Sequence, residues 1–322
     1  MSTAPQIDVW YGPLQRAGHC GQSQRWVNVL GRVRSASSLR SLECSLNGQA
    51  FQPLSVGPDQ RRLLAPGDFN IDLEVGRLVQ GANQIQIAAV DINGNHASSV
   101  VAVDYASADC PLPFMIDWNQ VSHIQDVAHI ADGLWSITGG VISPIEVGYD
   151  RLLTLGDMRW RDYEVTVPIT VHGINGGCYA HPSVHAGVGV VMRWKGHSEW
   201  EPDTYASGQP AFCPSPYGAI GWYCVFHDEG PLLNFFDPDF KRSAEKPLKL
   251  KLHTPHVLRA RVQTNPSGSS NYALKVWEQS RTEPDSWDLQ VAGHPASLGH
   301  GAVGLVAHHI AASFGNVSVS AV

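Results

Sequence analysis

The chain has 322 residues, of which 43% are hydrophobic and 16% charged, and its formal net charge is -7. This length suits two ordinary domains, and many Gly, Pro and Trp residues beside few helix formers favour an all-β protein rich in turns. The acidic balance without any Lys/Arg cluster excludes a nucleic-acid partner, and no apolar run reaches the roughly 18 residues of a membrane span.

The N-terminal stretch MSTAPQIDVWYGPLQ lacks the basic start and apolar core of an export signal. The compartment is therefore unknown from the sequence, and an extracellular or periplasmic location is expected if the chain is a mature form. Six cysteines are too few for a disulfide scaffold. Two interpretations stay open: an exported chain pairs Cys20 with Cys44 and Cys213 with Cys224, or the cysteines are buried free thiols.

Short strands are expected along the first hundred residues. WVNVLGRV and LRSLECSLNGQAF have strand character, and a turn at Asn47 and Gly48 interrupts the second. Residues 81–105 alternate apolar and polar side chains on both sides of DINGN, a turn whose Asn and Gly tolerate positive φ, so a hairpin is expected there. The strands recur without helical periodicity, as in a small β-sandwich.

The segment LVQGANQIQIAAVDINGNHASSVVAVDY, with LNG and the GDF of residues 67–69, resembles bacterial immunoglobulin-like modules. These modules commonly end in a long loop, G-x-N, an alternating strand, D-x-x-GN and a final strand. The resemblance covers roughly residues 5–105 and implies an immunoglobulin-like β-sandwich that acts as a spacer or packing partner. Two prolines and small residues in ASADCPLPFM then mark a boundary, which gives domains at 1–108 and 109–322.

The second half also alternates in the manner of strands. GLWSITGGVIS, WRDYEVTVPITV, HAGVGVVMRW and GAVGLVAHHIAASFGNVSVSAV resemble the concanavalin A-like lectin/glucanase jelly rolls, including the laminin-G-like group. The resemblance covers about residues 114–322 and implies a jelly-roll β-sandwich. Lectins, hydrolases, lyases and structural modules share this fold, so it leaves function open. In DYEVTVPITVHG, alternation places these residues on one face: Tyr163, Val165, Val167, Ile169 and Val171.

Paired catalytic acids of the glucanase type are missing from the sequence. Glycoside hydrolysis needs two acids that flank one bond about 5 to 10 Å apart, and the resemblance implies Glu-x-Asp-x-x-Glu on one strand. No such stretch exists, and the acidic groups in EWEPD, HDEG and FDPDF lie among Pro and Gly. They are expected to be solvated loop acids or calcium ligands. Asp237 and Asp239 are the candidate calcium ligands, and no other cofactor is expected.

Lyase chemistry is a second alternative. Polysaccharide lyases of similar fold use a Tyr and a His, with Arg, Gln or Asn to neutralise a uronate. Their Gln-Ile/Val-His and Tyr-x-Lys-x-Gly signatures are absent, yet Tyr223 and His227 share one face of GWYCVFH, while His185 and Arg193 share one face of HAGVGVVMRW. Strand histidines of this kind either transfer protons or are half-buried groups that contact a ligand, and both interpretations stay open.

Zinc is a third alternative, because Cys178, His181 and His185 have the types and spacing of zinc ligands. No second Cys/His pair follows at a finger-like distance. Chance clustering in a chain with 15 histidines therefore explains the pattern better.

The stretch HAGVGVVMRW has two faces in strand geometry. Two glycines on one face remove bulk beside a histidine and an arginine, which indicates a shallow groove. Trp200, in the long loop 195–217, is suited to stack on the apolar face of a sugar. The expected core face carries Ala186, Val188, Val190, Met192 and Trp194, and the expected groove face carries His185, Gly187, Gly189, Val191 and Arg193.

These patterns support three hypotheses. In the first, the jelly roll binds an oligo- or polysaccharide and the N-terminal domain is a spacer. In the second, the protein is a glycoside hydrolase or polysaccharide lyase with a non-standard active site. In the third, both sandwiches are structural or assembly modules. The candidate ligand-binding residues are His185, Arg193, Trp200, Tyr223 and His227.

Overall fold

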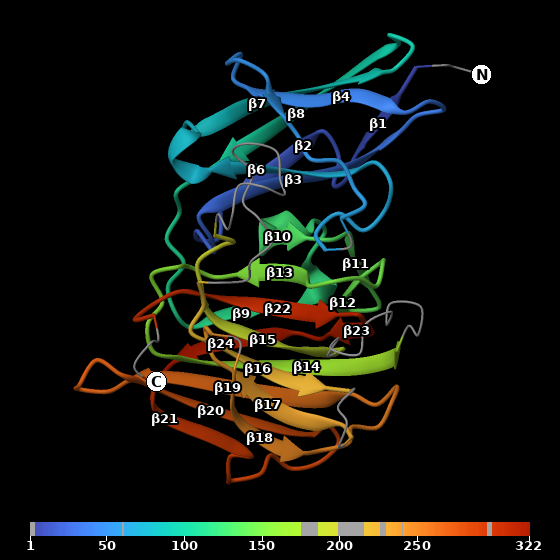
Figure 1. Cartoon of the computed structure of the whole chain (residues 1–322). Helices are drawn as coiled ribbons and strands as arrows, with labels where there is room; N and C mark the ends of the chain where they lie inside the picture. The colour runs from blue at the N-terminus through green and yellow to red at the C-terminus, as the bar shows by residue number, and fades with distance from the viewer. Residues whose placement is uncertain are drawn as a thin grey trace.

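The computed structural model describes residues 4–59, 61–174, 186–198, 216–225, 230–239, 241–294 and 298–322. Within these ranges the chain forms strands and three short 3-10 helices, which confirms the all-β class predicted from composition. Figure 1 shows two stacked bodies, the blue-to-cyan N-terminal one above the green-to-red C-terminal one. None of the described helices is long and apolar enough to cross a membrane. The 3-10 helices are η1 (Val75–Arg77), η2 (Trp118–Gln120) and η3 (Ile124–Asp126).

The N-terminal body is a sandwich of two sheets around one apolar core that includes Phe69, Ile85 and Val101. The three-stranded sheet has the order β1 (Gln6–Val9), β3 (Trp26–Arg34) and β6 (Asp68–Glu74). The five-stranded sheet has the order β2 (Leu14–Ala17), β8 (His96–Tyr105), β7 (Gly81–Asp91), β4 (Leu39–Leu46) and β5 (Gln52–Pro53).

Both predicted turns of this sandwich are present. The hairpin at residues 81–105 is the antiparallel pair β7 and β8. Its turn is held by the Asp91 carboxylate, which accepts the backbone N–H groups of Asn93 and Asn95 at 2.9 Å each. Asn47 and Gly48 have φ values of 50° and 75°, the positive values that a tight hairpin turn requires. The immunoglobulin-like identity of the sandwich stays a prediction.

The C-terminal body is a larger sandwich of two antiparallel sheets. Its seven-stranded sheet has the order β10 (His129–Asp132), β13 (Arg151–Leu155), β22 (Ala302–His308), β15 (Gly187–Trp194), β16 (Ala219–Cys224), β17 (Leu232–Phe236) and β18 (Arg242–Pro247). The second sheet has the order β11 (Trp135–Thr138), β12 (Val141–Pro144), β23 (Ile310–Phe314), β14 (Tyr163–Ile174), β19 (His256–Thr264), β20 (Ser270–Glu278) and β21 (Leu289–His294), with β24 (Val317–Ala321) pairing both β14 and β9 (Phe114–Ile116).

The two C-terminal sheets enclose the main core. The five residues predicted on one face of β14 are all buried and pack into it, so this alternation is confirmed. Val188, Val190 and Met192 of β15 belong to the same core from the opposite sheet. The facing sheets therefore place every second residue of β15 inward and leave the alternate residues on the outer face of the seven-stranded sheet.

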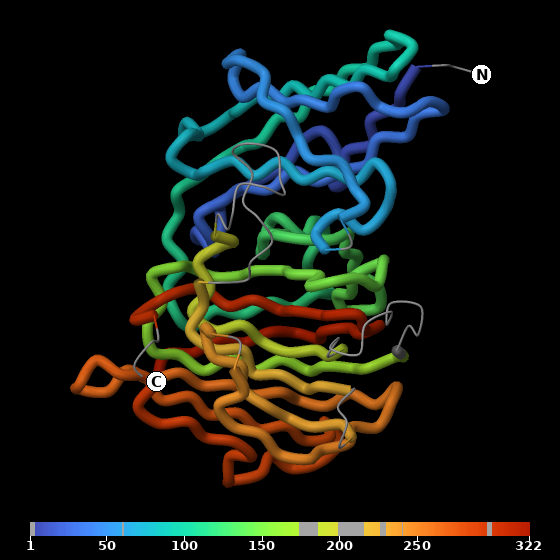
Figure 2. The backbone as a smooth tube through the Cα atoms, viewed as in Figure 1, coloured from blue at the N-terminus to red at the C-terminus, as the bar shows by residue number. Residues whose placement is uncertain are grey.

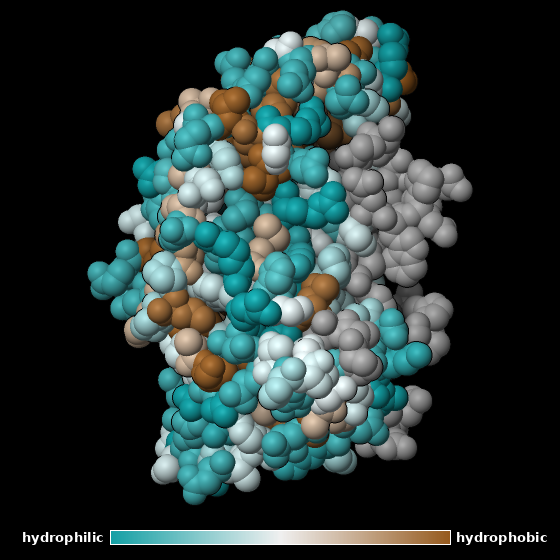
Figure 3. All heavy atoms as spheres, turned by 90° about the vertical axis from the view of Figure 1, so that its left-hand side faces the viewer, coloured by the Kyte–Doolittle hydropathy of each residue, from teal (hydrophilic) through white to brown (hydrophobic). Residues whose placement is uncertain are grey.

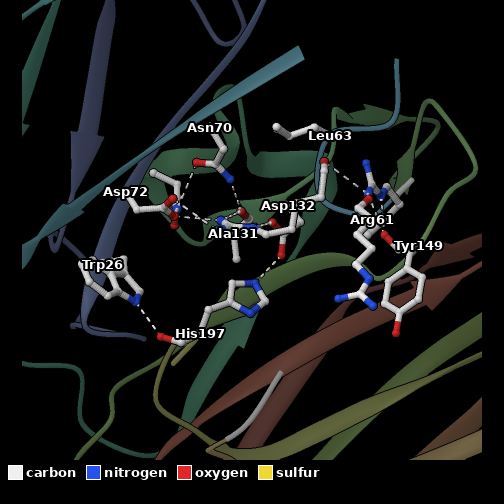
Figure 4. Close-up of polar contacts among 12 residues, drawn as sticks. Trp26, Arg61, Leu63, Asn70, Asp72, Ala131, Asp132, Tyr149 and His197 are labelled. Carbon is white, nitrogen blue, oxygen red and sulfur yellow. Dashed lines mark hydrogen bonds and ion pairs between the residues drawn. The ribbon is translucent and has the colours of Figure 1, made fainter. Parts of the chain in front are cut away.

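A buried ionic network joins the two sandwiches (Figure 4). Arg62 Nε donates to Asp132 Oδ1 at 2.6 Å, and its Nη2 donates to Asp72 Oδ1 at 2.8 Å. The second oxygen of Asp132 lies 2.6 Å from His197 Nε2. Burial alone would raise the pKa of Asp132, but the charges of Arg62 and His197 hold it well below its usual range. The network therefore keeps Asp132 ionised at the domain boundary.

Polar side chains on the three-stranded sheet complete this boundary. Asn70 Nδ2 donates to the Ala131 carbonyl at 3.0 Å, and the Trp26 indole donates to the His197 carbonyl at 2.8 Å. Asn28 N donates to His129 Nε2 at 3.3 Å. Because these bonds cross between the sandwiches, the N-terminal body is fixed against strand β10 of the C-terminal one. Figure 2 shows the chain crossing between the bodies as it turns from cyan to green.

Cys20, Cys44 and Cys110 are free thiols. Cys44 is buried in the N-terminal core, while Cys20 lies at the domain boundary, where its thiol donates to the Asp126 carbonyl. Burial raises the pKa of Cys44 to about 11 and that of Cys110 to about 12, so both are protonated at neutral pH. Cys20 and Cys44 are therefore not paired. Cys213, the predicted partner of Cys224, lies outside the described residues.

Candidate ligand-binding site

Several predicted site residues lie outside the described residues. These include His185, Trp200 and His227, and the zinc candidates Cys178 and His181. Their roles stay predictions. Arg193, Tyr223, Asp237 and Asp239 are described, and the structure places each of them.

Arg193 is turned away from the predicted groove. Met192 pairs with Val303 and Trp194 pairs with Ala302, so Arg193 is the extra residue of a β-bulge, with φ of 55°. The bulge breaks the alternation, which moves Trp194 from the predicted core face to the outer face.

The Arg193 guanidinium is instead enclosed at the end of the sandwich. The side chain is 0% exposed. Its Nη1 donates to Ser270 Oγ at 2.6 Å, and its Nη2 donates to Thr264 Oγ1 at 2.7 Å. Asp162 supplies a carboxylate at 3.1 Å. These contacts tie β15 to strands β19 and β20, so in this structure Arg193 holds the two sheets together.

Tyr223 faces the main core. It pairs with Val188, a core residue, and its buried hydroxyl accepts the Leu250 backbone N–H at 3.1 Å. Burial raises the pKa of Tyr223. The prediction placed Tyr223 on the groove face, but the register puts its neighbours Trp222 and Cys224 there, opposite Gly189 and Gly187.

The space beside the two glycines is occupied by the Trp222 side chain. A Cβ added to Gly187 would lie 2.6 Å from Trp222 Cε2 and 2.7 Å from its Nε1. A Cβ added to Gly189 would lie 3.0 Å from Trp222 Cε3. The indole therefore lies across both glycines, and Gly at these positions allows a ring of β16 to cover β15.

The Nε1 edge of the Trp222 indole lies next to Gly187, and so toward His308 on the neighbouring strand. Gly187 is the cross-strand partner of His308, and the rings of Trp222 and His308 are 6.1 Å apart in an edge-on arrangement. His308 Nδ1 lies 2.7 Å from Asp150 Oδ1, with 13% and 16% of the two side chains exposed. Because Asp150 engages Nδ1, Nε2 is the ring nitrogen left for another group.

Aromatic rings surround the Asp150–His308 pair. Tyr149 lies edge-on to His308 at 4.5 Å, and the His309 ring is 4.4 Å from that of His308. Burial and the neighbouring His308 lower the pKa of His309 to about 4, so His309 is neutral at physiological pH. The partly exposed Asp150–His308 pair is thus the polar edge of the outer face.

Three buried polar atoms on this face have no hydrogen-bond partner among the described residues: Trp194 Nε1, and the adjacent pair Trp222 Nε1 and Asn234 Oδ1. Trp222 is 5% exposed and Asn234 1%, and the two residues are direct cross-strand partners. A buried polar group without a partner costs about 1–3 kcal/mol. Such groups are rare in folded proteins, and a bound polar molecule is one of the ordinary explanations.

The calcium prediction does not fit the surroundings of Asp237 and Asp239. Asp237 Oδ1 accepts the backbone N–H groups of Asp239 and Lys241, both at 2.9 Å, so the carboxylate closes its own turn. His294 is the further neighbour, at 3.7 Å from Oδ2. No group of three or more potential metal-ligating side chains occurs among the described residues.

Sequence reasoning missed Asp150, Asn234 and His308. Asn234 had a usable signal, because it is the one polar residue in the apolar run LLNFF. His308 had a weaker signal: it follows Gly304 and Val306 at every second position of the same strand-like segment, so it is expected on the same face. Asp150 follows a glycine and precedes a strand, and nothing in the sequence ties it to His308.

No protein-family model matches the chain, and no curated protein matches it. Solved structures that are similar include the Ca2+-bound exoplasmic/lumenal domain of VIP36, with a TM-score of 0.43 and 10% identity over 65% of this chain and 90% of that one. Winged bean acidic lectin with methyl-α-D-galactose has a TM-score of 0.41 and 11% identity over 64% and 97%. A mutant alginate lyase Aly36B with alginate trisaccharide has 0.39 and 9% over 66% and 99%.

Proposed function

We propose that the outer face of the seven-stranded sheet binds a glycan, as the sequence led us to expect, but through different residues: Trp222, Asn234, His308 and Asp150. The observation that carries the proposal is the pair of buried, unpartnered atoms, one donor and one acceptor, on neighbouring strands. A sugar hydroxyl both donates and accepts, so a polyhydroxylated ligand satisfies the indole N–H and the amide oxygen together.

The surroundings of these atoms also suit a sugar. Ile220 and Phe236 are half-buried and pack on the apolar cluster of the outer face, which provides contact for sugar C–H groups. His308 Nε2 and the Asp150 carboxylate add polar groups at the partly exposed edge. The proposed site thus combines an apolar floor with a few fixed hydrogen-bonding groups.

The N-terminal sandwich supports this sheet in the proposal. The Arg62 network fixes it against β10, so it is a rigid neighbour and not a loosely tethered spacer. The assembly-module alternative stays a prediction; Figure 3 shows one flank of the molecule, where brown apolar groups lie among teal polar ones.

A catalytic role is the second candidate, and one observation favours it. The Asp150–His308 pair, with the Tyr149 ring 4.5 Å away, has the residue types of an acid–base centre. Release of reducing ends, or ultraviolet absorbance from an unsaturated uronate, would reveal hydrolysis or elimination. Activity that is lost in His308→Asn would support catalysis, and binding without turnover would leave the lectin-like function.

The experiment that tests glycan binding is a comparison of two Trp→Phe variants against a panel of polysaccharides in affinity gels. Trp222→Phe keeps an aromatic ring but removes the N–H, so affinity should fall about 5- to 10-fold. Trp194→Phe is the matched control, because its indole N–H is also buried without a partner, near His197. Equal loss in both variants, or binding unaffected in Trp222→Phe, would refute the site.

A further inference from the structure

A pair of exposed histidines lies on the outer face of the second C-terminal sheet, on the opposite side of the sandwich from Trp222. His172 belongs to β14, and His253 lies in the connection between β18 and β19. The centroids of their rings are 5.9 Å apart, at an interplanar angle of 42°. Both residues are exposed, so the pair faces solvent outside the proposed glycan site.

The backbone holds the two histidines side by side. His172 is the extra residue of a β-bulge, because the register of β14 against β23 shifts between Val171 and Gly173. His253 has a φ of 57°, and its backbone N–H donates to the Val171 carbonyl at 2.8 Å. The connection that carries His253 is thus tied to the residue that precedes His172.

Ser313 orients the His172 ring. Its Oγ lies 2.8 Å from His172 Nε2, and the residue is 5% exposed. Ser313 pairs with Thr170 on the outer face, while Ile169 and Ala312 beside them pack into the core. Because Ser313 engages Nε2, Nδ1 is the ring nitrogen of His172 that can bind another group. Metal-ligating histidines are commonly held in this way, by a hydrogen bond at the nitrogen that does not bind the ion.

The charge state of His172 also suits a metal ligand. Partial burial and the neighbouring His253 lower the pKa of His172 from its ordinary value of 6.5. A neutral imidazole keeps the lone pair that binds a cation, so the close approach of two histidines disfavours protons and favours a metal ion. Within the described part of the chain no third side chain of a metal-ligating type joins the pair, so a bound ion would keep water ligands.

We propose that His172 and His253 together bind a divalent transition-metal ion that prefers imidazole, of the class of Zn²⁺, Ni²⁺ and Cu²⁺. With metal–nitrogen bonds of about 2.0–2.1 Å, two imidazoles on one ion have ring centroids roughly 5 to 6 Å apart, which is the separation already present. Hard ions such as Ca²⁺ prefer oxygen ligands and should not bind here. The ion joins β14 to the connection before β19, so it stabilises the folded chain, and its binding does not depend on glycan at the other sheet.

Isothermal titration of the full chain with Zn²⁺ tests the site. His172→Asn and His253→Asn each remove one ligand, and asparagine tolerates the positive φ of position 253. Each variant should bind Zn²⁺ at least about 10-fold more weakly, since loss of a ligand costs no less than loss of a group that orients it. His96→Asn, which removes an exposed histidine of the N-terminal sandwich, should bind like the wild type. Absence of Zn²⁺ binding in the wild type, or unchanged binding in either ligand variant, would overturn the proposal.

A positioning variant and thermal unfolding give a second test. Ser313→Ala keeps both histidines but releases the His172 ring, so Zn²⁺ affinity should fall about 10-fold. Zn²⁺ should raise the melting temperature of the wild type and of His96→Asn more than that of His172→Asn, because an ion bound by the folded chain alone stabilises it. Ca²⁺ should leave all of these melting temperatures unchanged. An equal rise with Zn²⁺ in the wild type and His172→Asn would contradict binding by the pair.

Discussion

Arg62 of the N-terminal sandwich and Asp132 of the C-terminal one form an ion pair of 2.6 Å, with their side chains 4% and 0% exposed. Asp72 lies on the other side of the same guanidinium. Arg62 thus neutralises two buried carboxylates, one from each sandwich. This ion pair therefore fixes the position of the two sandwiches relative to each other in the folded protein.

Removal of this arginine should therefore be costly. Arg62→Met leaves Asp72 and Asp132 buried without their cation, and the free energy of unfolding should fall by about 3–5 kcal/mol. Urea unfolding measures the change. Arg34→Met, which removes an exposed pair with Asp8 at 3.4 Å, is the control and should cost less than about 1 kcal/mol. Similar losses in both variants would argue against a buried network.

Acid should destabilise the domain boundary through His129. Burial lowers its pKa to about 4 from the ordinary 6.5, and its Nε2 accepts the Asn28 N–H, which requires the neutral ring. The unfolded chain therefore takes up the proton first. Stability is complete above pH 6.5 and is lost as the pH falls toward 4, by about 1–2 kcal/mol for a partly exposed residue.

The measurement is the free energy of unfolding against pH in two variants. His129→Gln keeps an acceptor for Asn28 and cannot be protonated, so its profile should be flatter between pH 6.5 and 4. His96→Gln alters an exposed histidine and should leave the wild-type profile unchanged. A wild-type slope in His129→Gln would show that another group titrates.

Gly187→Ala should displace the Trp222 ring. The added methyl would clash with the Tyr223 carbonyl oxygen and would lie 2.6 Å from the indole, so we expect a loss of about 1–3 kcal/mol and a change in tryptophan fluorescence. Glycan binding should fall with it. Gly76→Ala, where nothing lies within 4 Å of the new methyl, should have little effect on either measurement.

Arg193→Lys tests whether this residue holds the sheets together or contacts the ligand. Lysine cannot reproduce the several directed bonds to Ser270, Thr264 and Asp162, so stability should fall by about 2–4 kcal/mol. Affinity of the folded variant for glycan should stay within about 2-fold of the wild type. A large loss of affinity with unchanged melting temperature would restore Arg193 to the binding site.

Local patterns of the sequence predicted the strands well. The apolar positions of β14 and the turn of the β7–β8 hairpin depend on side-chain alternation and on residues that tolerate positive φ, and both are properties of short segments. The same reasoning placed Val188, Val190 and Met192 correctly in the core.

The faces of the site residues depend on relationships between segments, and the predicted faces of Arg193 and Tyr223 were wrong. The bulge at Arg193 has no marker within its own strand, yet it reverses the faces of Arg193 and Trp194. Pairing of β15 with β16 decides that Trp222, and not Tyr223, faces outward. The Asp150–His308 contact joins residues 158 positions apart, so no local pattern contains it.

The central claim is that the Trp222 indole N–H binds a sugar hydroxyl, and the ¹H–¹⁵N spectrum of the ten tryptophan indoles tests it most directly. Trp222→Phe identifies the resonance, and Trp194 and Trp118 serve as internal references. On addition of a neutral glycan that binds, the Trp222 indole resonance should move as its hydrogen bond forms, while those of the two references stay in place. A glycan that binds and leaves the Trp222 resonance unmoved would contradict the proposal.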